Sequence, residues 1–239
     1  MLRTLWVAIV AIAVTIFSAS GVIAFSLVRP KSAWVDRLIR IWARTILSAA
    51  GVSIRTENEA ALEPDRHYVI IANHCSYLDI PSLQAAINQP LRFMAKKSLF
   101  SIPLFGQALQ ISGFVPVDRN NRKTAVRSFD MAAAQIRTGR TVVVFPEEGR
   151  SRTRDMRPFQ RGAFLLALRS GLPIVPVAIR GTFEVLPVGR LSIRPGTVTV
   201  VIGEPIDTAQ WSIRRREELA TLMREQISAM LGTPADQVS

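Results

Sequence analysis

The chain has 239 residues, of which 49% are hydrophobic and 20% charged, enough for one sizeable α/β domain with an appendage. Its 30 Lys and Arg against 18 Asp and Glu give a net charge of +12, which indicates a polyanionic partner such as a membrane surface or a phosphate-bearing substrate. No nucleic-acid-binding motif accompanies this charge, so we expect no nucleic acid partner. The single cysteine excludes an internal disulfide. With only two histidines and no ligand-type spacing, we also expect no metal site.

An uncharged segment runs from Thr4 to Val28 near the N-terminus. As a helix it would extend about 37 Å, longer than the hydrocarbon core of a bilayer at about 30 Å. A cleaved signal peptide is the alternative, because Ser18-Ala19-Ser20 resembles a cleavage site, but the apolar run continues beyond it. Basic residues are more numerous after the segment than before it. This bias favours a retained anchor with the rest of the chain in the cytoplasm.

Residues 33–49 follow with apolar and charged side chains on different faces of a helix. Trp34 and Trp42 suit a membrane interface, and packing of this helix on the domain is the alternative. A transmembrane helix and a hairpin within one leaflet both stay open. We therefore divide the chain into a membrane anchor at 1–50 (an apolar helix at 4–28 and an amphipathic helix at 33–49), a domain at 51–232 and a flexible tail at 233–239.

Short apolar runs alternate with helical patterns through the domain. Strands are predicted at 52–56, 68–72, 91–95, 113–117, 141–145, 173–179 and 197–202. Helices are predicted at 79–87, 103–111, 121–137, 159–170 and 212–231. This order predicts an α/β fold with a central, mostly parallel or mixed sheet flanked by helices.

A histidine and an aspartate follow the strand at 68–72. His74 comes just past the end of this strand, and Asp79 stands five residues further on, where a helix begins. The turn between them can bring the carboxylate to the imidazole, and a histidine held by a carboxylate is the working part of a general base. The alternative is that Asp79 only caps the helix and His74 is a polar turn residue.

Cations follow other predicted strands in the same way. Lys96, Arg119 and Arg150 each stand where a strand runs out into a loop, and Glu147 accompanies the last of them. Cations beside a base suit a reaction on a phosphate-bearing alcohol, since they hold the phosphate while the base takes the hydroxyl proton. Each of these residues alone fits an ordinary surface equally well. Further arginines up to Arg161 form a basic loop that could attract anionic membrane lipids.

Four stretches in this order resemble the motifs of the glycerolipid acyltransferases, and most closely those of the 1-acyl-glycerol-3-phosphate acyltransferases. The resemblance covers about residues 50–205. The N-H-x4-D motif is matched by Asn73-His74 through Asp79. The other three match Ala95–Leu99 with Val117-Asp118-Arg119, then Phe145–Ser151, and then Ile174–Ile179. The third motif usually reads F-P-E-G-T-R-S, and here Glu148-Gly149 replaces the Gly-Thr pair.

The resemblance implies an acyltransferase of a bacterial-type inner membrane, with its catalytic domain on the cytoplasmic face. His74 would deprotonate the sn-2 hydroxyl of lysophosphatidic acid while Asp79 orients the imidazole. The acyl group would come from the thioester of acyl-CoA or of an acyl carrier protein, with no metal or other cofactor. The residues implied in binding the acceptor are Glu147, Gly149, Arg150, Ser151, Arg119 and Lys96.

Three further interpretations stay open. The acceptor could be another lysophospholipid, glycerol 3-phosphate or a lyso-aminolipid. A non-catalytic membrane-binding protein with this fold would keep its lipid binding after His74→Ala. A hydrolase using Ser76 or Cys75 is the third, although no G-x-S-x-G motif frames either residue.

Overall fold

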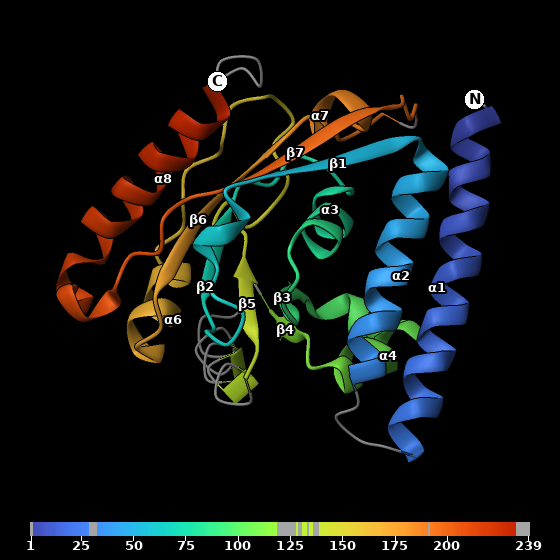
Figure 1. Ribbon diagram of the computed structural model, residues 1–239, viewed down its shortest axis with the longest axis horizontal. Helices are drawn as coiled ribbons and strands as arrows, with labels where there is room; N and C mark the ends of the chain where they lie inside the picture. The colour runs from blue at the N-terminus through green and yellow to red at the C-terminus, as the bar shows by residue number, and fades with distance from the viewer. Residues whose placement is uncertain are drawn as a thin grey trace.

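The computed structural model describes residues 2–28, 33–118, 128, 131–132, 134–135, 139–190 and 192–232. After two N-terminal helices, strands and helices alternate along these residues, and the strands form one mixed sheet (Figure 1). This confirms the predicted α/β fold.

The strands of the described chain are β1 (Val52–Glu57), β2 (Val69–Ala72), β3 (Leu91–Lys96), β4 (Val115–Val117), β5 (Thr141–Val144), β6 (Ile174–Arg180) and β7 (Gly196–Ile202). They form a seven-stranded sheet in the order β1-β7-β6-β2-β5-β3-β4. All neighbouring pairs are parallel except β6 and β7, which are antiparallel. β2 therefore lies in the middle of the sheet, between β6 and β5, and the chain that follows it leaves from the carboxyl edge, where α/β proteins place their ligands.

The helices are α1 (Leu2–Val28), α2 (Ala33–Ala50), α3 (Asp79–Ala86), α4 (Phe105–Ser112), α6 (Gly162–Ser170), α7 (Thr182–Val185) and α8 (Arg216–Gly232). Short 3₁₀ turns lie at Glu59–Ala61, Lys97–Ser101, Thr208–Gln210 and Ile213–Arg215. Of the predicted helix at 121–137, only 128, 131–132 and 134–135 are described, and they are helical. The helix predicted at 159–170 begins three residues late. Its first residues bond elsewhere, since the amide of Gln160 donates to the carbonyl of Pro146 at 2.8 Å.

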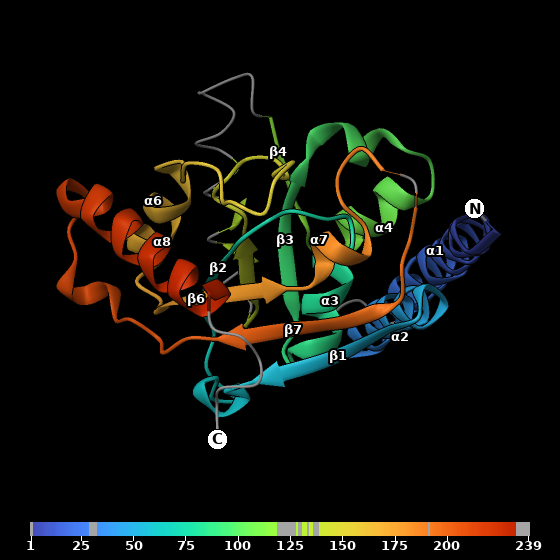
Figure 2. The same ribbon diagram turned by 90° about the horizontal axis from the view of Figure 1, so that it is seen from above.

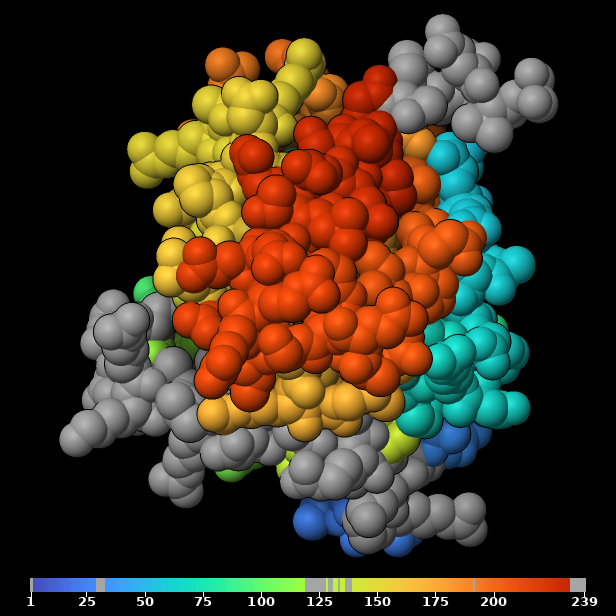
Figure 3. Space-filling view, turned by 90° about the vertical axis from the view of Figure 1, so that its left-hand side faces the viewer, coloured from blue at the N-terminus to red at the C-terminus, as the bar shows by residue number. Residues whose placement is uncertain are grey.

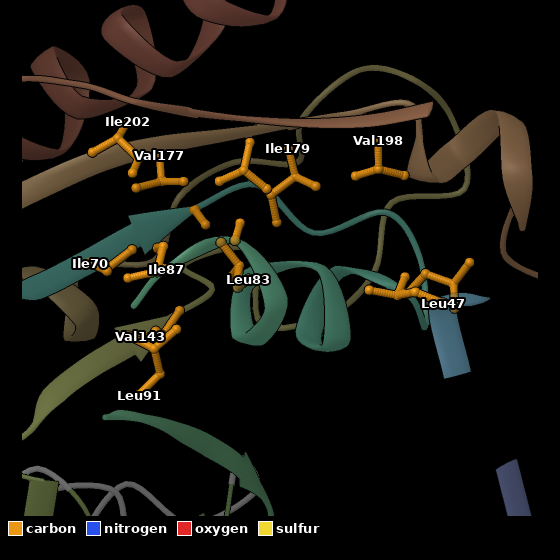
Figure 4. Packing of buried hydrophobic residues seen from close by; sticks show 14 of the residues in the cluster. Leu47, Ile70, Leu83, Ile87, Leu91, Val143, Val177, Ile179, Val198 and Ile202 are labelled. Carbon is orange, nitrogen blue, oxygen red and sulfur yellow. The ribbon is translucent and has the colours of Figure 1, made fainter. Parts of the chain in front are cut away.

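Helices cover both faces of the sheet, because successive side chains of a strand point to opposite sides. Ile70 of β2 packs in the cluster that contains α2 and α3, whereas Val69 and Ile71 pack in the cluster that contains α6 and α8. Figure 4 shows the first cluster extending from Ile70 across Leu83 of α3 to Leu47 of α2. Figure 3 shows α8 lying across the opposite side of the molecule.

α1 is apolar and largely exposed. In the described part of the chain it is the one helix long and apolar enough to cross a membrane by length and composition, and only 22% of its most apolar stretch is buried. Large exposed side chains such as Leu5, Trp6 and Phe17 distinguish it from a buried core helix. α1 is nevertheless hydrogen-bonded to the rest of the protein at two positions. Thr4 Oγ1 accepts from the amide of Ile193 at 3.2 Å, and Thr15 Oγ1 accepts from the indole of Trp42 in α2 at 2.9 Å.

α2 is joined to the sheet by an ion pair between a buried arginine and a partly exposed aspartate. Nη2 of Arg92 in β3 donates to Oδ1 of Asp36 at 2.6 Å, and its Nη1 donates to the carbonyl of Leu91 at 2.9 Å. The guanidinium is almost fully buried, and this burial lowers the pKa of Arg92. The last turns of α2 also supply Leu47 and Ala50 to the main core. The division of the chain at residue 50 stays a prediction, and the core extends into α2.

Candidate active site

The candidate site begins where β2 ends in the middle of the sheet. The buried side chain of Asn73 pairs with the backbone of Ile179 in β6, donating from Nδ2 at 3.0 Å and accepting at Oδ1 at 2.7 Å. This side chain continues the pairing of β2 with β6 by one further residue. His74 is therefore the first residue to leave the carboxyl edge of the sheet.

The imidazole of His74 is held by a buried carboxylate. Nδ1 of His74 lies 2.7 Å from Oδ2 of Asp79, which also accepts from the amides of Cys75 and Ser76 at 2.8 Å each. The second oxygen, Oδ1, accepts from the hydroxyl of Thr182 at 2.6 Å. These four contacts of the Asp79 carboxylate go to the turn and to Thr182 and none goes to an amide of α3, so the alternative of a simple helix cap does not describe it. With Nδ1 engaged in this way, Nε2 is the ring nitrogen left to accept a proton.

An aromatic ring stacks on one face of the imidazole. The ring of Phe145 lies parallel to that of His74, with centroids 4.0 Å apart and planes 14° apart. Phe145 in turn stacks on Phe93 of β3 at 6.0 Å. The stack fixes the plane of the imidazole, while the carboxylate fixes its rotation.

The loop after β5 is bonded to both backbone polar groups of His74. The amide of His74 donates to Oε1 of Glu147 at 2.7 Å, and its carbonyl accepts from the amide of Ser151 at 2.8 Å. Oε2 of Glu147 accepts from the amide of Arg157 at 2.7 Å. Glu147 thus bridges the His74 turn and the distal part of its own loop. Burial raises the pKa of Glu147 to about 7, and its two backbone donors oppose that rise.

Two of the residues expected to bind an acceptor make hydrogen bonds within the protein. Both oxygens of Glu147 accept backbone amides, and the hydroxyl of the buried Ser151 donates to the carbonyl of Asp155 at 2.7 Å. These contacts position the loop. A direct contact of either residue with an acceptor stays a prediction.

The altered pair in the third motif adopts an unusual backbone conformation. Glu148 has φ +51°, in the left-handed region that glycine adopts at lower cost than a residue with a Cβ atom. Gly149, which follows it, is partly buried. The replacement of glycine by Glu148 therefore places a side chain at a strained position and leaves the flanking Glu147 and Arg150 beside the His74 turn.

Arg150 is the cation that the structure brings to this turn. Its Cζ lies 3.5 Å from the ring centroid of Tyr77, and among the described residues it has no acidic partner. Lys96 is exposed at the end of β3, and no hydrogen bond or ion pair joins it to the His74–Asp79 pair in the described part of the chain. Arg119 lies outside the described residues.

The two nucleophiles of the hydrolase interpretation are not available for that chemistry. Sγ of Cys75 lies 3.3 Å from Oγ1 of Thr182, and burial, together with the nearby carboxylate of Asp79, raises the pKa of this thiol to about 12. The hydroxyl of Ser76 is fully buried and donates to the carbonyl of Leu186 at 2.8 Å. A neutral thiol and an engaged hydroxyl do not make a nucleophile.

An apolar cavity of about 120 Å³ lies on the far side of the aromatic stack. Phe93 lines it, together with residues of α1, α2 and α4 such as Ala19, Trp42 and Leu109. Because Phe93 also contacts Phe145, the cavity adjoins the imidazole through two rings. Within the residues that the structure describes, no group of three or more His, Cys, Asp or Glu is arranged to hold a metal ion.

Sequence reasoning missed three residues of the site. Thr182 follows β6, so the rule that placed His74 at the end of its strand could also have found it. Tyr77 lies within the first motif and Phe145 within the third, but nothing in their spacing indicates that they stack on Arg150 and His74.

The chain is similar to known acyltransferases in sequence and in structure. The family model described as Acyltransferase matches residues 53–180. A 1-acyl-sn-glycerol-3-phosphate acyltransferase of Chlamydomonas reinhardtii is 32% identical over 169 residues, which are 70% of this chain and 49% of that one. The protein of that name from Salmonella typhimurium is 31% identical over 185 residues, 75% of each chain. The chain thus spans about half the length of the algal relative and three quarters of the bacterial one.

A solved structure resembles the whole chain. The 1-acyl-sn-glycerophosphate acyltransferase PlsC of Thermotoga maritima superposes with a TM-score of 0.84 at 25% identity, covering 99% of this chain and 97% of that one. The family match extends over more than half of the sequence and contains both His74 and Asp79. The chain therefore belongs to the acyltransferase family that includes the 1-acyl-sn-glycerol-3-phosphate acyltransferases.

Proposed function

We propose that this protein is a membrane-bound 1-acylglycerol-3-phosphate O-acyltransferase that converts lysophosphatidic acid to phosphatidic acid. The observation that carries the proposal is the contact of 2.7 Å between Nδ1 of His74 and the buried carboxylate of Asp79. The other hydrogen bonds of this carboxylate come from two amides of the turn and from the hydroxyl of Thr182. The relatives named above act, by their names, on the same class of acceptor.

In the proposed reaction Nε2 of His74 takes the proton from the sn-2 hydroxyl as the oxygen attacks the thioester carbonyl carbon. The carbon–sulfur bond then breaks, and the leaving thiolate recovers the proton from the imidazolium. Asp79 stabilises the imidazolium while it exists, and general-base catalysis of this kind is typically worth about 10²–10⁴-fold in rate. The step requires neither a metal ion nor an organic cofactor, so treatment with a chelator should leave the activity unchanged.

Arg150 is the residue best placed to hold the acceptor phosphate. Its guanidinium lies over the ring of Tyr77 beside the His74 turn, and the edge of a guanidinium matches phosphate oxygens. We extend this role to Arg119 and Lys96 as predictions from the family resemblance. The apolar cavity beyond Phe145 would accommodate part of an acyl chain.

We further propose that α1 and α2 attach the protein to one face of a bilayer, with the catalytic domain in the cytoplasm. α1 contacts the protein near its start and at its middle, which favours a helix lying in one leaflet over an isolated crossing. The exposed side of α2 alternates Trp34 and Ile41 with Arg37 and Arg44, a pattern that suits anionic headgroups above an apolar layer.

The test is acyl transfer from oleoyl-CoA or oleoyl-acyl carrier protein to lysophosphatidic acid by membranes that contain the native chain or His74→Ala. We expect phosphatidic acid from the native chain and a loss of at least a hundredfold in the variant. His67→Gln is the matched control, because His67 lies at the opposite end of β2 and should keep its activity. Equal product from the native chain and His74→Ala would refute the role of the imidazole.

The same assay decides between the acceptors. Glycerol 3-phosphate, other lysophospholipids and lyso-aminolipids run in parallel, and faster acylation of any of these would replace lysophosphatidic acid as the acceptor. No acyl transfer to any acceptor, with lipid binding retained in both the native chain and His74→Ala, would support the non-catalytic membrane-binding interpretation.

A further inference from the structure

A second cavity, larger and more polar than the one beyond Phe145, adjoins the His74 turn. It is open, has a volume of about 500 Å³, and lies between α7, the carboxyl end of β6 and the start of β7. Figure 2 shows α7 directly beyond the end of β6. Asn73 and Cys75 contribute to its wall, and among the described residues His74 does not. The cavity therefore lies behind the turn, on the side away from the imidazole.

Three arginines from three separate segments converge on this cavity. Arg154 comes from the loop after β5, Arg180 from the end of β6, and Arg194 from the loop before β7. Glu184 is the one acidic residue that the described chain contributes to the lining, and it pairs with Arg154 at 2.9 Å. Arg180 pairs with Glu57 at 2.6 Å. Arg194 is exposed and has no ion pair within the described residues. The cavity thus carries a net positive charge.

Arg154 also shows which way the basic loop faces. Its partner Glu184 belongs to α7, and the nearby carbonyl of Met156 accepts from Arg224 of α8 at 3.4 Å. Figure 1 shows α8 on the opposite side of the molecule from α1. The loop that the sequence indicated as a lipid contact therefore faces α7 and α8.

We propose that this cavity binds the phosphate groups of the acyl donor's carrier, namely the phosphopantetheine or nucleotide phosphates of the thioester. The inference rests on the proposed acyltransferase function. The phosphate of the acceptor is joined to the reacting hydroxyl by a short glycerol backbone, so it must lie close to Nε2, on the side of Arg150. A cavity separated from the imidazole by the 73–75 backbone is unsuitable for that phosphate. The phosphates of the donor are separated from its thioester by the long pantetheine arm, so they can lie in a cavity behind the turn while the thioester reaches the imidazole.

The first test is equilibrium binding of coenzyme A to the detergent-solubilised full chain, which requires no acyl transfer. We expect Arg194→Ala to weaken this binding about five- to tenfold, the effect of one charge-assisted contact to phosphate. Glu184→Gln should strengthen binding about twofold, because it removes the carboxylate from the lining. Arg190→Ala is the matched control, since Arg190 lies in the same loop as Arg194 but outside the cavity, and thermal melting verifies that each variant is folded.

The second test is steady-state kinetics on the same variants. Arg194→Ala should raise KM for oleoyl-CoA and leave KM for lysophosphatidic acid unchanged. Oleoyl-pantetheine lacks phosphate, so the native chain and Arg194→Ala should use it as a donor equally well. An equal effect with oleoyl-acyl carrier protein would assign the cavity to the pantetheine phosphate, and an effect with oleoyl-CoA alone would assign it to the nucleotide phosphates.

Two results would overturn the inference. One is that Arg194→Ala raises KM for lysophosphatidic acid and leaves KM for oleoyl-CoA unchanged. The other is that Arg194→Ala binds coenzyme A as tightly as the native chain. If the native chain binds coenzyme A with the expected dependence on Arg194 but acylates no acceptor, the proposed function fails while the assignment of the cavity stands.

Discussion

Replacing Asp79 with asparagine is expected to separate the electrostatic role of this residue from its structural one. The carboxylate accepts four hydrogen bonds, from Nδ1 of His74, the amides of Cys75 and Ser76, and the hydroxyl of Thr182. In Asp79→Asn the amide oxygen can keep the first three bonds and the amide group can donate to the hydroxyl, which rotates to accept. Few buried donors are then left without a partner, but the negative charge is lost.

The magnitude follows from this contact list. A hydrogen bond to a charged group is worth about 1 kcal/mol more than a neutral one, so four such bonds put an upper bound of about 4 kcal/mol on the loss of stability. The smaller cost of burying a neutral side chain offsets part of this loss. Without the carboxylate the imidazolium is not stabilised, and kcat should fall about 10²–10⁴-fold, which is about 3–5 kcal/mol in the activation barrier.

Acyl-transfer kinetics and thermal melting of the same preparations test this prediction. Thr182→Val is the matched control, since it removes one contact from Oδ1 but leaves the carboxylate beside the imidazole. It should lower stability by about 1 kcal/mol and kcat by less than about tenfold. If Asp79→Asn kept more than a tenth of the native kcat, the carboxylate would not be what activates His74.

Two further predictions concern the loop after β5. Burial raises the pKa of Glu147 from 4.5 to about 7. Between these two pH values the folded protein keeps a proton on Glu147 that the unfolded chain has released. The free energy of unfolding should therefore fall as the pH rises from 4.5 to about 7, by at most about 3 kcal/mol. Urea unfolding at pH values between 4.5 and 8 measures this slope. Glu147→Gln should flatten it, and an unchanged slope would contradict the assignment. Glu148→Gly should raise the free energy of unfolding by about 0.5 kcal/mol, because it relieves the strain of φ +51° but makes the unfolded chain more flexible. Glu148→Val should lower it by about 1 kcal/mol, and the same sign for both substitutions would show that strain at this position is not the cause.

The sequence predicted the parts of the site that depend on local order along the chain. The apolar run before His74 marked a buried strand, and the five-residue spacing to a helix start indicated that Asp79 could fold back on the imidazole. Both inferences need only the periodicities of strands and helices. The order of the strands was beyond such reasoning, because a buried strand carries the same apolar pattern whichever neighbours it has.

The role of Glu147 shows why contacts between distant segments were not predicted. The family resemblance implied that Glu147 binds the acceptor, and an acidic residue in a loop gives no sequence signal for a buried bridge between two backbone segments, because such residues are normally exposed. The bridge depends on β5 lying directly beside β2, which brings residues separated by 73 positions within 2.7 Å. Thr182 stands just past the end of β6, where the strand-end rule applies, but α7 has only four residues and its sequence gives no separate helical signal.

The ion pair between α2 and β3 limits how this protein can be shortened. Removing the first 50 residues would leave Arg92 buried without its partner Asp36, and loss of one partner from a buried pair typically costs about 3–5 kcal/mol. The same deletion would strip Leu47 from the main core, which adds about 1.5–3 kcal/mol. Together these losses approach the whole stability of an ordinary domain, about 5–15 kcal/mol. The N-terminal helices are therefore not an exchangeable module, and a variant with a less apolar surface would require substitutions on α1 rather than its deletion.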